Sequence, residues 1–416
     1  MNDAAPAPVT VVGIGADGWQ GLAAASQEEL AAAEVVIGGP RQLGLLPPRV
    51  GARRVPWPSP LRPAVPRVLA AHEGRRVAVL ASGDPMFFGI GRTLADVVGH
   101  GRLRVLPHPS SVSYACARLG WPVEETQVVS LVGRPAAALA GALFDHRRLL
   151  VLSPGSRGPA DVAALLRAHG FGPTRMRVLE RLGSGRERTV EGTAADWGDP
   201  ACDPLNVVAL DCRAAPDTAR LGLTPGLPDT AYDSDGQLTK RHVRAATLAA
   251  LAPAPGELLW DVGSGSGSIA IEWMRAHPSC RAVAIERDPD RARRIARNAA
   301  ALGVPGLRVV AGAAPEALEG LPRPAAVFIG GGLTAPGLPD ACWAALPPGG
   351  RVVANAVTLE SEAVLTGWHA RHGGGLVRIS VATATPVGGF TGWRQAMPVT
   401  QWAAATPPAH RTGGRP

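Results

Sequence analysis

The chain has 416 residues, 46% of them hydrophobic, and it carries a formal net charge of +8 with a pI of about 10.2. That length exceeds what one hydrophobic core usually supports, so we expect two domains, and no apolar run approaches the roughly 18 residues of a membrane-spanning helix. The positive charge comes from dispersed arginines, with Lys240 as the single lysine, which argues against a nucleic-acid partner and favours a carboxylate-rich small molecule.

The first half of the chain, from residue 9 to about residue 211, alternates short β-branched runs with stretches rich in Ala and Leu. This alternation predicts βαβ units and largely parallel sheets, and hence an α/β fold. The predicted strands lie in VTVVGIG, AEVVIGG, RRVAVLASGD, LRVLPH, TQVVSL, RRLLVLS, RMRVLERLG and LNVVALD.

Three loops of the first half directly follow predicted strands. Their candidate ligand-binding residues are Gly13 and Gly15 in GIG, Gly83, Asp84 and Pro85 in SGDPMFFGIG, and Ser110 and Ser111 in PSSVSYACARLGW. Ligands of open α/β sheets bind in the crevice outside the carboxyl ends of the strands, so the three loops together predict a binding site. For the second loop the alternative is a Gly-Asp-Pro turn with a purely structural role.

Residues 213–236 are punctuated by Pro and Gly without periodicity, and we expect a linker and a loop leading into the second domain. A helix from residue 237 then precedes a second α/β run up to residue 405. Its strands are expected in ELLWDVG, RAVAIERD, LRVVAGA, AAVFIGG, GRVVANAV and GLVRISVATATPV. The tail, residues 406–416, is expected to be disordered.

The most informative motif follows the first of these strands. Its residues are Asp261, Gly263, Ser264, Gly265, Ser266 and Gly267, after which a helical pattern begins. Glu286 ends the next apolar run, 19 residues after Gly267, where a doubly wound fold places a carboxylate on a ribose hydroxyl. The motif predicts an adenosine-containing cofactor. A dinucleotide such as NAD, or a glycine-rich turn without a ligand, remains as an alternative.

A dinucleotide fingerprint would place its third small residue at Ser268, whereas this chain has an extra glycine at Gly267. The resulting D-x-G-x-G-x-G resembles motif I of class I S-adenosyl-L-methionine (SAM) methyltransferases. This resemblance implies a Rossmann-like class I domain over residues 237–405, with a seven-stranded sheet that ends in an antiparallel strand.

Further motifs of the second half resemble the decarboxylating precorrin methyltransferases: T-K-R-H before motif I, F-I-G-G-G at 328–332 and V-A-N-A-V-T-L-E at 353–360. The resemblance implies that Thr239 contacts the cofactor and that Gly312, Ala313 and Ala314 lie beside its adenine. The family has an aspartate where this chain has Ala313, so backbone groups of this segment are expected to hold the adenine.

In residues 1–212, the order G-I-G, G-D-P-x-x-x-G, P-S-S-V and A-C-A-R-L-G-W resembles the tetrapyrrole (corrin and porphyrin) methylases. This family has a SAM-binding fold of two α/β subdomains, unrelated to class I, so the resemblance implies a second SAM site. Where the family has S-x-H-G-R, this chain has SLVGRP, with Val132 in place of the histidine. No proton transfer is therefore expected at that position, although Arg134 could bind a carboxylate.

Both resemblances together imply an enzyme of cobalamin biosynthesis that acts on a polycarboxylate tetrapyrrole, a precorrin (precorrin-6Y/6B). The first domain would methylate carbon 5, and the second would methylate carbon 15 and remove CO2 from the acetate on carbon 12, giving precorrin-8. Two SAM molecules would be consumed. The alternative is a class I tRNA or protein methyltransferase, which would leave the first half unexplained.

Methyl transfer from a sulfonium requires alignment and exclusion of water more than a catalytic triad, so the sequence identifies no catalytic residue firmly. The candidates for binding substrate carboxylates or assisting decarboxylation are Lys240, Arg241, His242, Asn355, Glu360, Trp393 and Arg394. For each of them a solvated helix face or loop is the alternative.

The five cysteines are scattered, with no C-x-x-C pair and no histidine cluster, and the N-terminus lacks the basic and apolar regions of a secretory signal. We therefore expect no metal, a cytoplasmic location and no membrane partner. A homo-oligomer is also expected.

Overall fold

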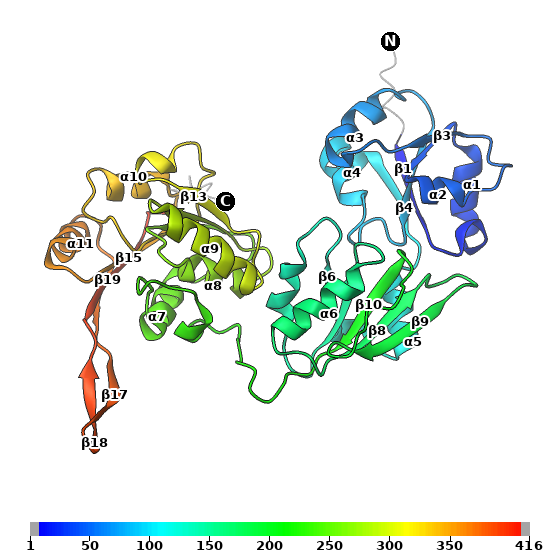
Figure 1. Cartoon of the computed structure of the whole chain (residues 1–416). Helices are drawn as coiled ribbons and strands as arrows, with labels where there is room; N and C mark the ends of the chain where they lie inside the picture. The colour runs from blue at the N-terminus through cyan, green and yellow to red at the C-terminus, as the bar shows by residue number, and fades with distance from the viewer. Residues whose placement is uncertain (1–7, 409–416) are drawn as a thin grey trace, which may run out of the picture. The chain divides into compact units, whose positions relative to one another are not determined.

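The computed structural model describes residues 8–408, which form two compact units (Figure 1). Unit 1 comprises the residues up to Ala136 together with Leu143–Thr218, and unit 2 comprises Ala137–Ala142 and the residues from Ala219 onwards. The predicted tail beyond residue 408 lies outside the described residues. Thr406, at its beginning, is held in place by a hydrogen bond from its backbone N–H to the Gly350 carbonyl.

Unit 1 begins with a five-stranded sheet in the order β3-β2-β4-β1-β5, in which every pair of neighbours is parallel. Its strands are β1 (Val9–Ile14), β2 (Val35–Gly38), β3 (Arg53–Pro56), β4 (Val77–Ser82) and β5 (Leu103–Leu106). The helices between them are η1 (Gly18–Gly21), α1 (Ala24–Ala32), α2 (Pro40–Gly44), α3 (Leu61–Ala70), α4 (Gly91–Val98) and η2 (His100–Arg102). The central strands β1 and β4 are buried on both faces, as their continuous β-branched runs predict.

The second sheet of unit 1, in the order β6-β7-β10-β8-β9, is mostly antiparallel. Its strands are β6 (Gln127–Ser130), β7 (Arg148–Leu152), β8 (Arg175–Glu180), β9 (Arg188–Thr193) and β10 (Asn206–Asp211), and its helical segments are α5 (Ser111–Leu119), η3 (Val123–Glu125), η4 (Ala136–Ala142) and α6 (Gly158–Ala168). Only β6 and β7 are parallel. The expectation of largely parallel sheets is therefore wrong here, because short loops connect β8 through β9 to β10 where a crossover helix would be needed.

Unit 2 contains a seven-stranded sheet in the order β13-β12-β11-β14-β15-β19-β16. Its strands are β11 (Leu258–Val262), β12 (Arg281–Glu286), β13 (Arg308–Ala311), β14 (Ala326–Ile329), β15 (Arg351–Ala356), β16 (Gly375–Ile379) and β19 (Val399–Ala405). The first five are parallel to one another, and β19 runs antiparallel between β15 and β16. This is the expected Rossmann-like class I sheet, although β19 itself was missing from the predicted strands.

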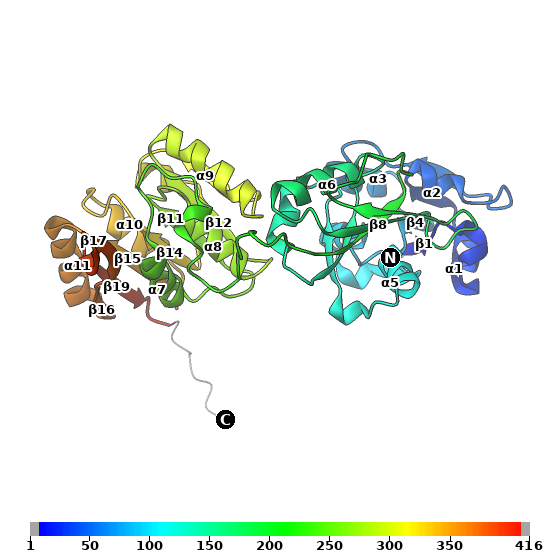
Figure 2. The same ribbon diagram turned by 60° about the horizontal axis from the view of Figure 1, so that its bottom comes forward.

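Helices cover both faces of this sheet (Figures 1 and 2). They are η5 (Asp229–Ala231), α7 (Arg241–Leu251), α8 (Ser268–Ala276), α9 (Pro289–Ala301), η6 (Glu316–Leu318), α10 (Leu338–Ala345) and α11 (Leu359–His372). On one face α7, α8 and α9 pack around the buried Trp273, and on the other face α10 and α11 pack around Trp368 and Trp402. Two apolar layers thus hold the carboxyl edge of the parallel strands in place, and this edge carries the predicted cofactor motif.

Strands β17 (Ala382–Val387) and β18 (Phe390–Gln395) form a separate antiparallel hairpin between β16 and β19. Figure 1 shows this hairpin extending away from the rest of unit 2. Its apolar side chains are largely exposed, with Phe390 at 84% and Trp393 at 79% of full accessibility. The sequence predicts one strand over residues 375–387, whereas the chain forms two strands there, β16 and β17, and β17 pairs with β18, which was not predicted.

Candidate functional site

The glycine loop between β11 and α8 passes very close to the loop after β14. Gly263 has φ of +70°, and a Cβ atom added to it would lie 2.6 Å from the backbone nitrogen of Gly331. Only glycine accommodates both the left-handed backbone and this approach. The D-x-G-x-G-x-G and F-I-G-G-G motifs, far apart in sequence, therefore form one wall of a site.

Asp261 supports this loop from below. Its side chain is fully buried, and Oδ2 accepts hydrogen bonds from Ser264 Oγ at 2.7 Å and the Ala270 backbone N–H at 3.0 Å. Oδ1 has no hydrogen-bond partner among the described residues, and burial raises the pKa of this carboxyl group to about 6. Asp261 is absent from the lining of the adjacent cavity. Its predicted role as a cofactor ligand thus becomes one of holding the loop to the first turn of α8.

Glu286 lies at the end of β12, is 4% exposed and lines the cavity. Its Oε2 accepts the Gly265 backbone N–H at 2.8 Å, and its Oε1 accepts the Asp288 backbone N–H at 3.0 Å. Each carboxylate oxygen can accept a further hydrogen bond. The side chain is therefore oriented by the backbone and still able to accept the two hydroxyl groups of a ribose.

The cavity beside this loop has a volume of about 1180 Å³. Drug-sized ligands occupy pockets of roughly 300–1,000 Å³, so the volume suits a nucleoside together with part of a larger molecule. The lining includes the predicted residues Thr239, Lys240, Arg241, His242, Gly263, Ser264, Gly265, Glu286, Gly312, Ala313, Ala314 and Asn355. Residues far apart in the sequence are thus brought together around one space.

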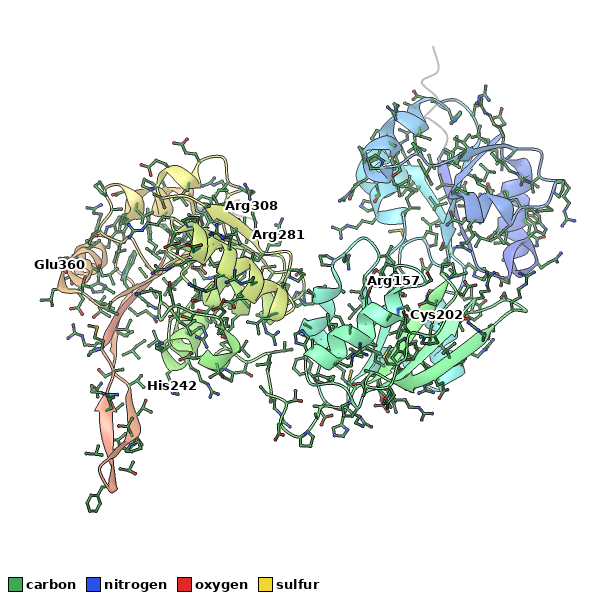
Figure 3. All side chains as sticks on the ribbon, viewed as in Figure 1. Arg157, Cys202, His242, Arg281, Arg308 and Glu360 are labelled. Carbon is green, nitrogen blue, oxygen red and sulfur yellow. The ribbon has the colours of Figure 1, made fainter. Side chains whose placement is uncertain are left out.

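Besides Asp261, five predicted residues lie outside this lining. Ser266 is 1% exposed and donates its hydroxyl to the Gln237 carbonyl, and Gly267 precedes the first residue of α8. Glu360 is exposed on the first turn of α11, the helix that begins at Leu359 (Figure 3), and it is absent from the lining. Arg394 is exposed on β18 in the projecting hairpin, as is its neighbour Trp393. The structure therefore does not bring Glu360 or Arg394 to the candidate site.

The chain that leads into α7 is held by a buried ion pair. Arg244 is fully buried, and its Nε donates to Glu272 Oε1 at 2.6 Å. Glu272 also accepts the backbone N–H groups of Gly226 and Leu227 and the hydroxyl of Tyr232. A buried charge pair with all these donors fixes the chain ahead of Thr239 against α8. The wall of the cavity that carries Lys240 and His242 is therefore preorganised.

Unit 1 contains a second cavity, of about 570 Å³. It lies at the carboxyl ends of β1 and β4 and at the start of α5, where Gly15, Gly83, Ser110 and Ser111 line it as expected. The side chain of Ser110 also caps α5 by accepting the Ser113 backbone N–H. The three predicted loops of the first half thus meet at one site.

The remaining predicted residues of unit 1 shape this cavity from outside its lining. A Cβ atom on Gly13 would lie 2.0 Å from the Gly83 carbonyl oxygen, so Gly13 permits the contact between two loops. Asp84 accepts the Met86 backbone N–H at 2.8 Å, and Pro85 is buried in the same turn. The structural alternative therefore describes Asp84 and Pro85 better than direct ligand contact does.

Sequence reasoning missed a polar cluster beneath this cavity. His108 Nε2 lies 3.2 Å from Asp17 Oδ2, and the Tyr114 hydroxyl lies 3.5 Å from the same oxygen. Tyr114 lines the cavity, whereas Asp17 and His108 are absent from its lining. The cluster connects the loop after β1 with the loop after β5. No local motif announces it, because the members are up to 97 residues apart.

An apolar rim borders the unit 1 cavity. Phe87, Phe88 and Val132 all line it, and they are 40%, 50% and 60% exposed. The guanidinium carbon of Arg134 lies 5.6 Å from the centre of the Phe88 ring. Val132 therefore contributes apolar surface where the family has a histidine, and Arg134 is positioned beside that surface.

Residues 8–408 contain neither a cluster suited to a metal ion nor a membrane-spanning helix. No cluster of three or more His, Cys, Asp or Glu side chains could hold a metal ion there. Among the helices of the same residues, none is long and apolar enough to cross a membrane.

Comparison with known proteins identifies both units. Residues 8–197 match the family described as Tetrapyrrole (Corrin/Porphyrin) Methylases, and residues 230–406 match the one described as Precorrin methyltransferase domain. Two shorter relatives each cover less than half of this chain. Cobalt-precorrin-7 C(5)-methyltransferase of Salmonella typhimurium is 32% identical over 180 residues, or 43% of this chain and 88% of the relative. Probable cobalt-precorrin-6B C(15)-methyltransferase (decarboxylating) of Pyrobaculum calidifontis is 37% identical over 143 residues, or 33% and 73%.

A longer relative spans almost the whole chain. Precorrin-6Y C(5,15)-methyltransferase (decarboxylating) of Sinorhizobium sp. is 50% identical over 395 residues, which is 95% of either chain. The two family matches follow one another along this chain, and each falls largely on one of the two units. The chain therefore belongs to the family of the decarboxylating precorrin-6Y C(5,15)-methyltransferases.

Proposed function

We propose that this chain transfers two methyl groups from SAM to a precorrin of the 6Y type, at carbons 5 and 15, and removes CO2 from the acetate on carbon 12. The observation that carries the proposal is the 1180 Å³ cavity of unit 2, which joins Glu286 and the glycine loop to Lys240 and His242. One end of the cavity suits a ribose, and the other end suits carboxylates, as a methyl donor and a polycarboxylate acceptor require.

The residues of unit 2 fit SAM. Glu286 has free lone pairs for the ribose hydroxyls, and Gly263 allows the loop to approach the backbone of Gly331, which forms the wall of the cavity. Backbone groups from Gly312 to Ala314 line the cavity without a carboxylate, so they would hold the adenine. When bound, SAM supplies an electrophilic methyl group on its sulfonium. The chain itself contributes binding, alignment and exclusion of water.

The start of α7 supplies positive charge for the substrate. Lys240, Arg241 and His242 all line the cavity and are exposed, and Figure 3 shows His242 at this end of the helix. Arg241 Nε donates to the Gly226 carbonyl at 2.8 Å. The terminal nitrogens of the guanidinium remain available for a carboxylate. Peripheral carboxylates of the macrocycle would thus be held here, with a ring carbon directed toward the methyl donor.

We assign methylation at carbon 5 to unit 1, with its own SAM site. Its cavity joins Gly15, Ser110 and Ser111 to the apolar rim of Phe87 and Phe88, which suits the flat face of a macrocycle. The names of the two shorter relatives support this division, since one is a C(5)-methyltransferase and the other a decarboxylating C(15)-methyltransferase on a separate chain.

Mass spectrometry of the product tests the proposal directly. The full chain is incubated with a 6Y-type precorrin and SAM carrying a ¹³C-labelled methyl group. We expect a product with two labelled methyl groups and one carboxyl group fewer, together with released CO2. A product with one labelled methyl group and no loss of CO2, or an unchanged precorrin, would refute it.

We also propose that the chain is a homo-oligomer that uses the β17–β18 hairpin. Phe390 and Trp393 expose 84% and 79% of their full accessible surface, and large exposed apolar patches usually mark interaction sites. Replacing both residues by serine should lower the mass measured by analytical ultracentrifugation to that of a monomer. An unchanged mass would exclude the hairpin as the interface.

For the compartment we propose the cytoplasm. All five cysteines are free, and the four buried ones, Cys116, Cys212, Cys280 and Cys342, lie on or beside strands and helices of the two cores. Free thiols without disulfides are typical of a reducing compartment. Fractionation of cells that produce the full chain would test this assignment.

A further inference from the structure

Asn355 belongs to a closed hydrogen-bond network on the α7 face of the unit 2 sheet. It lies on β15 opposite Gln401 of β19, and both side chains meet Thr247 of α7. Asn355 Nδ2 donates to Thr247 Oγ1 at 2.9 Å, and Gln401 Nε2 donates to the same oxygen at 3.0 Å and to Asn355 Oδ1 at 2.9 Å. Thr247 is fully buried and Gln401 is 4% exposed, so water does not compete for these bonds.

The direction of every bond in this network is determined by one carbonyl group. Thr247 Oγ1 lies 2.8 Å from the Val243 carbonyl, which can only accept, so the single hydroxyl proton points there. The threonine oxygen must then accept from both amides. It follows that the nitrogen of Asn355, not its oxygen, faces Thr247, and that the Asn355 oxygen accepts from Gln401.

After these bonds are counted, Thr247 Oγ1 and Gln401 Nε2 have no capacity left, whereas Asn355 has one N–H and one lone pair unused. Asn355 is also the member of the three that lines the 1180 Å³ cavity. Its amide therefore presents a donor and an acceptor to the cavity in an orientation that the two buried residues prevent from flipping.

We propose that Thr247 and Gln401 are positioning residues for Asn355, whose free N–H donates to a carboxylate oxygen of the bound macrocycle. The inference rests on the proposed function, which supplies a polycarboxylate substrate. A carboxylate can only accept, so it selects the N–H and not the carbonyl of Asn355. Fixing that donor holds the C–C bond to the carboxylate parallel to the π orbitals of the macrocycle. The electron pair of this bond can then pass into the conjugated system as CO2 leaves, and a proton from water converts the remaining CH2 group into a methyl group.

Two near-isosteric variants test the network in the full chain. Thr247→Val removes the hydroxyl that orders both amides, and Gln401→Glu replaces a donor by a carboxylate that cannot donate to Asn355. In both variants we expect kcat for CO2 release to fall about tenfold to a hundredfold, the effect of a misplaced group. The Kd for SAM, measured by calorimetry, should stay within about twofold, because no member of the network touches the glycine loop.

Thr366→Val is the matched control. Thr366 also donates its hydroxyl to the carbonyl four residues earlier, that of Glu362, but it is exposed on α11 and outside the cavity. Its kcat should equal that of the unmodified chain, and Thr247→Ser, which keeps the hydroxyl, should recover most of the loss. The inference is overturned if Thr247→Val and Gln401→Glu turn over normally, or if Thr366→Val is equally impaired.

The outcomes separate this inference from the proposed function. An unmodified chain that neither methylates nor decarboxylates the precorrin refutes the function itself. If Thr247→Val also loses SAM binding, Gln401→Glu alone tests the inference. A normal kcat in Gln401→Glu overturns it, and a lower kcat with unchanged SAM binding supports it.

Discussion

The two cavities of this chain use glycine loops in different ways. In unit 2 a carboxylate, Glu286, lines the cavity and accepts the backbone N–H of the loop, while a second carboxylate, Asp261, braces the loop from below. In unit 1 the residues that line the cavity include no Asp or Glu, and a Cβ atom on Gly15 would lie closest to Asp17 and His108, which are outside the lining. Two sites proposed for one cofactor thus differ in whether a carboxylate lines the cavity.

The comparison teaches that close approach of the backbone, and not charge, is common to both sites. Each cavity depends on a glycine at which a Cβ atom would collide with a neighbouring loop, Gly13 with Gly83 and Gly263 with Gly331. Carboxylates that line the cavity occur in unit 2 alone, because Asp17 of unit 1 lies outside the lining. Variants that separate these two contributions should therefore affect the units differently.

The largest effect is expected from substitutions that place a methyl group in these close backbone contacts. Gly263→Ala should destabilise unit 2 by about 4 kcal/mol, because it adds backbone strain to a collision with backbone atoms. Methylation at carbon 15 and CO2 release should be lost while methylation at carbon 5 continues, and Gly13→Ala should give the reverse pattern. The products are distinguished by mass spectrometry.

Gly349→Ala is the control for this pair. Gly349 has φ of +76°, and a Cβ atom there meets nothing within 4 Å. It should cost only the strain of a left-handed residue, about 1–2 kcal/mol, with both activities retained. If Gly263→Ala is no worse than Gly349→Ala, the close approach is not what the site requires.

The next effect concerns pH. Burial raises the pKa of Asp261 to about 6, so the folded chain holds this proton more tightly than the unfolded chain does. Its contribution to stability is complete below the unfolded pKa of about 4 and is lost as pH rises through 6, by about 3 kcal/mol in total. Asp261→Asn should remove this loss. Urea unfolding of unit 2 between pH 4 and pH 7 should show the variant gaining stability relative to the unmodified chain.

The unit 1 transition serves as the internal reference in that measurement. Since Asp261 is buried within unit 2, Asp261→Asn should leave the pH dependence of unit 1 as it is. A difference between variant and unmodified chain that does not change with pH would show that Asp261 is ionised throughout.

A smaller effect is expected on cofactor binding. Glu286→Ala should raise the SAM dissociation constant of unit 2 about tenfold, or about 1.4 kcal/mol, through lost hydrogen bonds to the ribose. Calorimetry on the full chain should show one of two binding events weakened. Glu286→Gln keeps an oxygen for the Gly265 N–H. Its affinity for SAM should therefore lie between those of the unmodified chain and Glu286→Ala. An unchanged affinity in Glu286→Ala would remove Glu286 from the site.

The smallest effect compares two helix caps. Ser110 caps α5 in unit 1, and Thr358 caps α11 in unit 2 by accepting the Ser361 backbone N–H. Changing either residue to alanine should lower stability by about 1 kcal/mol. Ser110→Ala should affect only the unfolding transition of unit 1, and Thr358→Ala only that of unit 2, as calorimetric scans would show. A shift of both transitions by one variant would mean that the units unfold together.

The sequence was sufficient for the parts of the site that are contiguous in the chain. The glycine loop and Glu286 could be predicted because a strand, a sharp turn and a helix leave a local pattern of residue types, whereas Thr239 was implied by the family resemblance alone. The fold classes of both units followed from the same kind of pattern together with family resemblance, and the comparisons confirm them.

The remainder depends on tertiary contacts that leave no local pattern. The partners of Asn355 are 108 and 46 residues away from it, and the antiparallel pairing of β8 with β10 is set by long-range packing. Glu360 ends the V-A-N-A-V-T-L-E motif of the resemblance, but whether a residue there faces the cavity depends on the direction in which α11 leaves the sheet. Asp261 likewise occurs in a cofactor motif although its side chain points into the core.

The position of β19 has a consequence for how the chain is made. This strand is the last in chain order within the described residues, and it inserts between β15 and β16, which precede it. A ribosome adding roughly 5–20 residues per second releases β15 seconds before β19, whereas every strand of unit 1 has already emerged. Until β19 has emerged, β15 is therefore an unpaired edge strand of unit 2, and Asn355 lacks the hydrogen bond from Gln401. Nascent chains would acquire the fold of unit 1 first, and the complete cavity of unit 2 only after β19 has emerged.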